Sequence, residues 1–177
     1  MSGQRQIQNL ALIGFMGTGK SSVGRLVAAQ LHFNFLDTDE MIETRAGISI
    51  SEIFAHSGEK VFRELEAQLL LELSRAHHTV ISTGGGLAAN PDNLASLKQH
   101  ALIVCLWASP TVIWERVRGQ THRPLLQGPE PLQNVRQLLS TREPVYKQAD
   151  VLVNTEQRSI KDVAQHVMHQ FHLARSR

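Results

Sequence analysis

The segment Gly14-Phe-Met-Gly-Thr-Gly-Lys-Ser21 has the residue types and the spacing of a loop that holds phosphate groups. It follows the apolar run 10–13 and precedes a stretch whose apolar residues recur at helical spacing. Glycines let backbone N–H groups point inward, and the start of the helix adds partial positive charge. Lys20 would then reach the β- and γ-phosphates, and the Ser21 hydroxyl would hold Mg²⁺. A glycine turn that binds nothing is the alternative, and it leaves the lysine and the hydroxyl unexplained.

Two carboxylates, Asp37 and Asp39, follow the short apolar run 33–36. If the extended geometry of that run persists, both side chains lie on the same side of the chain. One could help to hold Mg²⁺, directly or through water, and the other could orient a substrate hydroxyl or take its proton. A solvated acidic turn or a helix cap is the alternative. The phosphate loop nearby favours the functional interpretation over this alternative.

An arginine and a glutamate, Arg63 and Glu66, lie one turn apart on a long predicted helix and can pair. A surface ion pair is the simpler interpretation. In the functional interpretation, Arg63 donates two hydrogen bonds to a substrate carboxylate and Glu66 holds it in position.

Three successive glycines, Gly84, Gly85 and Gly86, come where the chain leaves a predicted strand. The missing side chains would let the backbone approach a ligand closely and offer its N–H groups. A flexible turn is the alternative.

Three more arginines are candidates for anion binding, although a solvated surface position is the alternative for each. Arg123 lies in the Gly- and Pro-rich segment 118–131, which has the composition of a lid, and could neutralise charge during phosphoryl transfer. Arg116 is a possible neighbour of a nucleotide base. Arg142, four residues before Tyr146, is a second candidate for a substrate anion.

The elements that must position these residues alternate between strand and helix patterns, which predicts an α/β fold with a mostly parallel sheet. We expect strands at 10–13, 33–36, 79–82, 101–107 and 150–154. We expect helices at 20–31, 40–45, 49–56 and 59–75, and further helices that begin at residues 91, 110 and 160. Another helix should end at about residue 146, with a break or kink at Pro144. In such a sheet ligands gather at the carboxyl ends of the strands, where the candidate residues lie.

The composition excludes several classes of protein. The 177 residues suggest one domain, with 42% hydrophobic and 19% charged residues. The net charge of +2 is too weak to indicate a nucleic-acid partner, and no apolar run is long enough to span a membrane. The single cysteine, Cys105, excludes an internal disulfide and fits a reducing cytoplasm. The nine histidines do not have metal-site spacing.

Taken together, these motifs resemble the shikimate kinase family, from about Asn9 to the last helix. The matching segments are Gly14–Ser21, Asp37-Thr-Asp39, Phe62-Arg63-Glu64-x-Glu66, Thr83-Gly84-Gly85-Gly86, Arg123-Pro124-Leu125-Leu126 and Arg142-x-x-x-Tyr146. The resemblance implies a three-layer α/β/α sandwich around a central, mostly parallel five-stranded sheet, the P-loop kinase fold. It also implies one domain over 1–177, with a substrate-binding subdomain at 39–62 and a lid at about 117–131.

The activity implied by the resemblance is transfer of the γ-phosphate of ATP to the 3-hydroxyl of shikimate, with Mg²⁺, in aromatic amino-acid biosynthesis. The implied catalytic residues are Lys20, Asp39 and Arg123. The implied nucleotide site comprises Gly14, Gly17, Thr18, Gly19, Lys20, Ser21, Ser22, Arg116, Arg123 and Pro124. The implied substrate site comprises Asp39, Phe54, Phe62, Arg63, Glu66, Gly84, Gly85, Gly86 and Arg142. Ser21 and Asp37 would serve the metal.

Two other functions compete with this one. Another small-molecule kinase, such as a gluconate or nucleotide kinase, has the same scaffold, but Arg63, Arg142 and Asp39 favour a hydroxylated carboxylic acid. A sensory module that binds a metabolite without catalysis would not need Lys20 and Arg123. We expect a cytoplasmic monomer that has no nucleic-acid or membrane partner.

Overall fold

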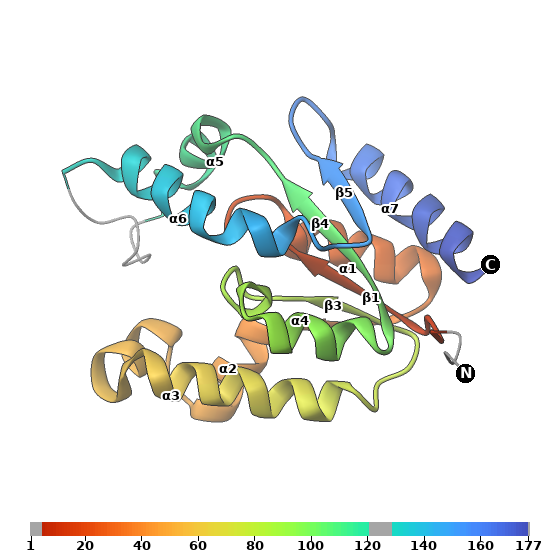
Figure 1. Cartoon of the computed structure of the whole chain (residues 1–177), viewed down its shortest axis with the longest axis horizontal. Helices are drawn as coiled ribbons and strands as arrows, with labels where there is room; N and C mark the ends of the chain where they lie inside the picture. The colour runs from red at the N-terminus through yellow and green to blue at the C-terminus, as the bar shows by residue number, and fades with distance from the viewer. Residues whose placement is uncertain (1–4, 121–128, 177) are drawn as a thin grey trace.

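A computed structural model describes residues 5–120 and 129–176, and five parallel strands form one sheet (Figure 1). The strands are β1 (Asn9–Ile13), β2 (Asn34–Asp37), β3 (Thr79–Ser82), β4 (Ala101–Trp107) and β5 (Val151–Asn154). Their order across the sheet is β2-β3-β1-β4-β5, and each neighbouring pair is parallel. The register pairs Leu12 with Ser82 and Ser82 with Asp37, so β1, β3 and β2 end at the same edge.

Helices cover both faces of this sheet, which confirms the three-layer α/β/α prediction. The helices are α1 (Lys20–Leu31), α2 (Thr38–Ala46), α3 (Ile50–Leu73), α4 (Pro91–Lys98), α5 (Pro110–Val117), α6 (Pro131–Tyr146) and α7 (Ile160–Arg175), with the 3₁₀ turn η1 (Leu87–Ala89). Figure 1 shows α1 and α7 side by side on one face. The other helices lie on the opposite face.

Two apolar clusters, one on each face, form the core. Alternate residues of β1 belong to them: Leu10 and Leu12 pack toward α1 and α7, while Ala11 and Ile13 pack toward α3 to α6. A central parallel strand is buried on both faces, so it is apolar throughout rather than alternating. Among the described residues, no helix combines the length and the apolarity needed to cross a membrane.

The extended geometry considered for Asp37 and Asp39 does not persist, and Asp37 takes the alternative position of a helix cap. β2 ends at Asp37, and α2 begins immediately with Thr38. The Asp37 carboxylate caps α2 by accepting from the N–H groups of Asp39 and Glu40. A short polar side chain that binds the free N–H groups of a first helical turn favours helix over strand here.

The predicted end of a helix at about Tyr146 is confirmed, but Pro144 does not break α6, which continues through it. The predicted interruption at Gly58 is confirmed: α3 has a kink there, with φ at 80°. Both Ser49 and Ser159 form capping boxes, with Glu52 and Asp162. The start of α5 at Pro110 is as predicted, although the Ser109 side chain does not cap it.

Candidate active site

The phosphate loop folds as its glycines require. Gly14 has φ at 133°, and a Cβ at this position would lie 2.1 Å from the Leu106 carbonyl oxygen, so no other residue fits. The Thr18 hydroxyl and the Lys20 ammonium both donate to the Phe15 carbonyl oxygen, each at 2.8 Å. Lys20 is 8% exposed, so its charge lies over the loop rather than in bulk water.

Hydroxyl and carboxylate oxygens meet beside this loop. The Ser21 hydroxyl donates to Asp37 Oδ2 at 2.6 Å and lies 3.3 Å from the Ser82 hydroxyl. These are hard oxygen ligands, and Mg²⁺ in kinase sites typically takes one or two of them together with substrate phosphates and water. The described residues contain no cluster of three or more His, Cys, Asp or Glu side chains with metal-site geometry. Ser21 and Asp37 therefore fit the Mg²⁺ role predicted for them.

Three predicted substrate residues lie against three successive glycines. A Cβ on Gly84 would be 2.3 Å from Asp39 Oδ1, and a Cβ on Gly86 would be 2.7 Å from the Arg63 guanidinium. A Cβ on Gly85 would be 3.6 Å from the Arg142 guanidinium and 3.3 Å from the Met16 nitrogen. The glycine segment therefore leaves room for two arginines and one aspartate, and it packs against the phosphate loop.

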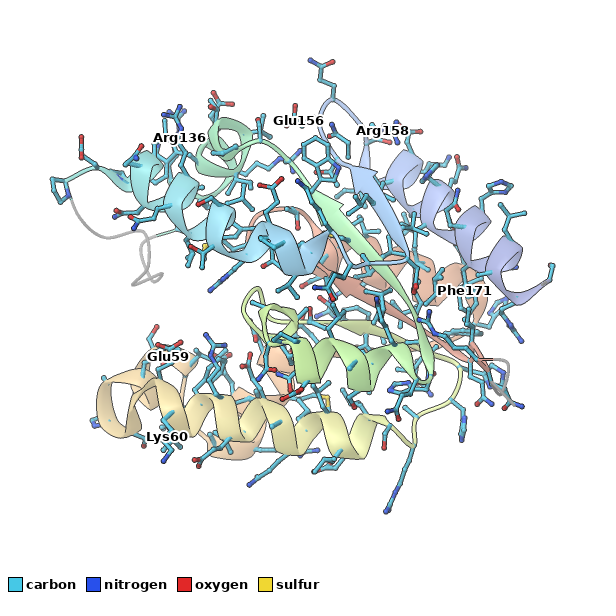
Figure 2. All side chains as sticks on the ribbon, viewed as in Figure 1. Glu59, Lys60, Arg136, Glu156, Arg158 and Phe171 are labelled. Atoms are coloured by element: carbon cyan, nitrogen blue, oxygen red, sulfur yellow. The ribbon has the colours of Figure 1, made fainter. Side chains whose placement is uncertain are left out.

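Arg63 and Glu66 form the predicted pair. Arg63 donates to Glu66 Oε2 at 2.7 Å and to the exposed Glu59 at 3.0 Å. Glu66 is 1% exposed, and its other oxygen, Oε1, has no hydrogen-bond partner among the described residues. Burial raises the pKa of the Glu66 carboxyl, and the pairing with Arg63 offsets this only in part. Figure 2 shows Glu59 on the side of α3 toward α6, and Lys60 on the other side.

Arg142 reaches the same segment from α6. Its guanidinium donates to the Gly85 carbonyl oxygen at 3.0 Å and lies over the Phe15 ring, 5.5 Å from the ring centre. The Tyr146 hydroxyl donates to the same carbonyl oxygen. Burial raises the pKa of Tyr146 to about 12, so its phenol keeps the proton that this bond requires.

Two aromatic rings lie near Arg63. The rings of Phe54 and Phe62 are 5.0 Å apart, and the Arg63 guanidinium lies 5.3 Å from the Phe62 ring centre. Phe62 is buried and Phe54 is half-buried. An apolar surface and a cation therefore meet at the same end of the glycine segment.

A separate pocket of about 260 Å³ adjoins the phosphate loop on the side of α7. Its lining includes Gly17, Thr18, Gly19, Ser22, Arg116, Thr155 and Arg158. Arg116 closes one end, because it donates to the Gly17 carbonyl at 3.2 Å and to the Thr155 hydroxyl at 2.9 Å. Figure 2 shows Arg158 in the loop between β5 and α7 that borders this region.

The structure brings most of the predicted site residues to the carboxyl edge of the sheet. Arg123 and Pro124, with the centre of the predicted lid, lie outside the described residues. Sequence reasoning missed Thr38, whose hydroxyl accepts from the Gly84 N–H at 2.8 Å. Thr38 directly follows the end of β2, and this position is the signal that could have indicated it. The resemblance placed Asn154-Thr155 near the adenine site without assigning contacts in the segment 154–159, and Thr155 and Arg158 of this segment line the pocket.

Comparisons with known proteins show the family of this chain. The family model described as shikimate kinase matches residues 16–172. A shikimate kinase of Caldanaerobacter subterraneus is 43% identical over 92% of this chain and 95% of its own length. One of Thermus thermophilus is 42% identical over 90% of this chain and 87% of its own.

Solved structures agree as well. The shikimate kinase of Acinetobacter baumannii in complex with shikimate matches with a TM-score of 0.90 and 36% identity, over 96% of this chain and 95% of that one. A gluconokinase of Sinorhizobium meliloti, at 19% identity and a TM-score of 0.64, shares the fold alone. The chain belongs to the shikimate kinase family, whose members are small-molecule kinases.

Proposed function

We propose that this chain transfers the γ-phosphate of ATP to the 3-hydroxyl of shikimate, giving shikimate 3-phosphate and ADP. The observation that carries the proposal is the arrangement of Asp39, Arg142 and Arg63 against Gly84, Gly85 and Gly86, beside the phosphate loop. Two cations and one carboxylate around a bare backbone segment suit a small acid that carries hydroxyl groups. Family membership supports the same reaction.

Arg63 and Arg142 would hold the substrate carboxylate, because a guanidinium can donate two parallel hydrogen bonds to it. Asp39 would accept from the substrate hydroxyls and orient the one that attacks. The N–H groups of Gly85 and Gly86 would contact the substrate, Phe54 and Phe62 would border its ring, and Glu66 would orient Arg63.

On the nucleotide side, Lys20 and Arg123 would stabilise the transferring phosphoryl group, with preorganised positive charge as the main source of acceleration. Ser21 and Asp37 would hold Mg²⁺, which when bound neutralises charge on the phosphates. Arg116 and Pro124 would lie near the adenine. The remaining nucleotide contacts would come from Gly14, Gly17, Thr18, Gly19 and Ser22.

We further propose that residues 1–177 form one domain in which two segments close over the ligands. The segment 39–62 would close over the substrate and the segment at about 117–131 over the nucleotide, excluding water from the reaction. The enzyme would act as a cytoplasmic monomer. Gel filtration with light scattering tests the monomer, and a dimer mass would contradict it.

The reaction is tested by a coupled assay of ADP release with Mg-ATP and a panel of acceptors: shikimate, gluconate, quinate, AMP and none. We expect turnover with shikimate alone. Turnover with gluconate or AMP instead would keep the kinase and overturn the substrate. Absence of turnover together with saturable shikimate binding in calorimetry would favour a sensory protein.

The assignment of the substrate carboxylate to Arg63 has its own test. Arg63→Ala removes a charged hydrogen-bond donor worth about 1.5–3 kcal/mol, so the KM for shikimate should rise about 10- to 100-fold. The matched control is Arg75→Ala, an exposed arginine just after α3. An unchanged KM in Arg63→Ala would contradict the assignment.

A further inference from the structure

A second pocket lies beyond the site described above, between α6 and the strands β4 and β5. Its volume is about 480 Å³, within the range of pockets that bind small molecules. None of the predicted site residues lines it. We propose that this pocket binds a small aromatic carboxylate, and that the bound ligand favours the position in which α6 holds Arg142 against Gly85. The proposed effect of the ligand on α6 and Arg142 rests on the proposed function.

The floor of the pocket is apolar and partly uncovered. Cys105 and Trp107 lie on the same face of β4, and Leu152 of β5 pairs with Cys105. Trp107 is 43% exposed and Leu152 is 48% exposed, although both lie within strands. Burial raises the pKa of the Cys105 thiol to about 12, so the floor carries no charge. An aromatic ring would cover this apolar surface.

The rim of the pocket favours an anion. Glu143 and Lys147 both line it and pair with each other at 2.7 Å, so their charges compensate. Arg136, also in the lining, forms no ion pair with any residue in the ranges that the structure describes. Figure 2 shows Arg136 on α6, on the side away from α3. A carboxylate can accept two parallel hydrogen bonds from the Arg136 guanidinium.

Tyr146 connects this pocket to the proposed substrate site. Its side chain lines the pocket, and its hydroxyl donates to the Gly85 carbonyl oxygen. Arg142, four residues earlier on α6, donates to the same oxygen. A ligand packed against Tyr146 therefore restricts α6 in the position that presents Arg142. We expect it to lower the KM for shikimate and to leave kcat unchanged, and shikimate should tighten its binding in turn.

Binding is tested with the Trp114→Phe variant, which leaves Trp107 as the only tryptophan. The probes are 3-phenylpropanoate and its neutral amide, each titrated at saturating shikimate so that a carboxylate does not simply occupy the substrate site. We expect a saturable change in Trp107 emission and binding of the carboxylate about 10-fold tighter than that of the amide. Equal affinities, or no emission change, would overturn the site.

Two variants locate the probe. Arg136→Gln should reduce the affinity of the carboxylate to that of the amide, whereas the control Arg75→Gln should leave it unchanged. Ser140→Phe should fill the pocket from the exposed face of α6 and abolish binding of both probes. Unchanged carboxylate affinity in Arg136→Gln would overturn the assignment of the anion.

The coupling is tested by the KM for shikimate with and without saturating probe. A decrease that disappears in Tyr146→Phe is expected. An increase would mean competition at the substrate site, and an unchanged KM with a bound probe would overturn the coupling. The emission titration does not depend on turnover, so failure of the proposed reaction and failure of the pocket are distinguishable.

Discussion

The Ser21 hydroxyl donates a hydrogen bond of 2.6 Å to Asp37 Oδ2, and this contact joins the phosphate loop to the end of β2. The second oxygen of Asp37 accepts from the N–H groups that begin α2. The Asp37 carboxylate thus lies where a phosphate-bound metal is expected, and it also caps the first turn of α2, the helix that carries Asp39. Asp37, proposed for the metal, and Asp39, proposed for the acceptor, are therefore only two residues apart.

Asp37→Asn separates these two roles. Asparagine caps a helix as well as aspartate does, so α2 should keep its start, while the charge next to Ser21 is lost. We expect kcat to fall about 10- to 100-fold, the range seen when a carboxylate that supports a metal site is removed, and the Mg²⁺ concentration at half-maximal rate to rise. Rates measured across a Mg²⁺ titration check this.

The control for this substitution is Asp92→Asn, an exposed aspartate in the first turn of α4. It should leave both the rate and the Mg²⁺ requirement unchanged. If Asp37→Asn changed neither the rate nor the Mg²⁺ requirement, Asp37 would act only as a helix cap and the metal role would be lost.

The fold could be predicted largely because its local signals agree with one another. The apolar run of β4, the Asn90-Pro91 start of α4 and the capping box at Ser159 each match the element that forms. The failures came where a side chain acts on the backbone locally. Asp37 caps a helix, so the extended geometry considered for Asp37 and Asp39 does not persist, and α6 continues through Pro144 where a break or kink was expected.

The site was harder to predict than the fold, because its contacts join distant segments. Motif types could indicate Asp39, Arg63 and the glycines, but not that each glycine faces one particular side chain. The convergence of Arg142 and Tyr146 on one carbonyl oxygen depends on how α6 packs against η1, which no local pattern encodes.

The glycine segment gives a paired prediction. Gly84→Ala would place a Cβ 2.3 Å from Asp39 Oδ1, on a short side chain near the start of a helix that cannot retreat easily. Gly86→Ala would press instead on the far end of the longer, more flexible Arg63. We expect Gly84→Ala to lower kcat strongly, and Gly86→Ala mainly to raise the KM for shikimate. Steady-state kinetics with circular dichroism checks both, and equal effects on kcat would contradict the separate roles.

Tyr146→Phe removes one of the two donors to the Gly85 carbonyl oxygen and leaves Arg142 in place. The loss of one buried hydrogen bond costs about 1 kcal/mol, so we expect the KM for shikimate to rise about 5-fold at unchanged kcat. Urea unfolding measures how much stability is lost. A fall in kcat without a change in KM would mean that Tyr146 does not act through the substrate carboxylate site.

The raised pKa of Glu66 predicts how the KM for shikimate depends on pH. Because burial raises its pKa above the ordinary 4.5, Glu66 takes up a proton at a higher pH than an exposed glutamate does. Protonation weakens its hold on Arg63, so the KM for shikimate should rise as the pH falls through this raised pKa. Glu66→Gln should have a high KM without this pH dependence. Glu59→Gln, which removes the exposed partner of Arg63, should keep it.

The raised pKa of Glu66 also predicts how the free energy of unfolding changes with pH. The folded protein binds the Glu66 proton more tightly than the unfolded chain does, so the stabilisation from that proton is fully present below the ordinary pKa. It is lost as the pH rises through the raised pKa of the folded state. The free energy of unfolding of the parent chain, minus that of Glu66→Gln, should therefore decrease as the pH rises above 4.5 and then become constant. Urea unfolding of both proteins across this range measures the difference, and an increase with pH would mean that the ion pair with Arg63 outweighs burial.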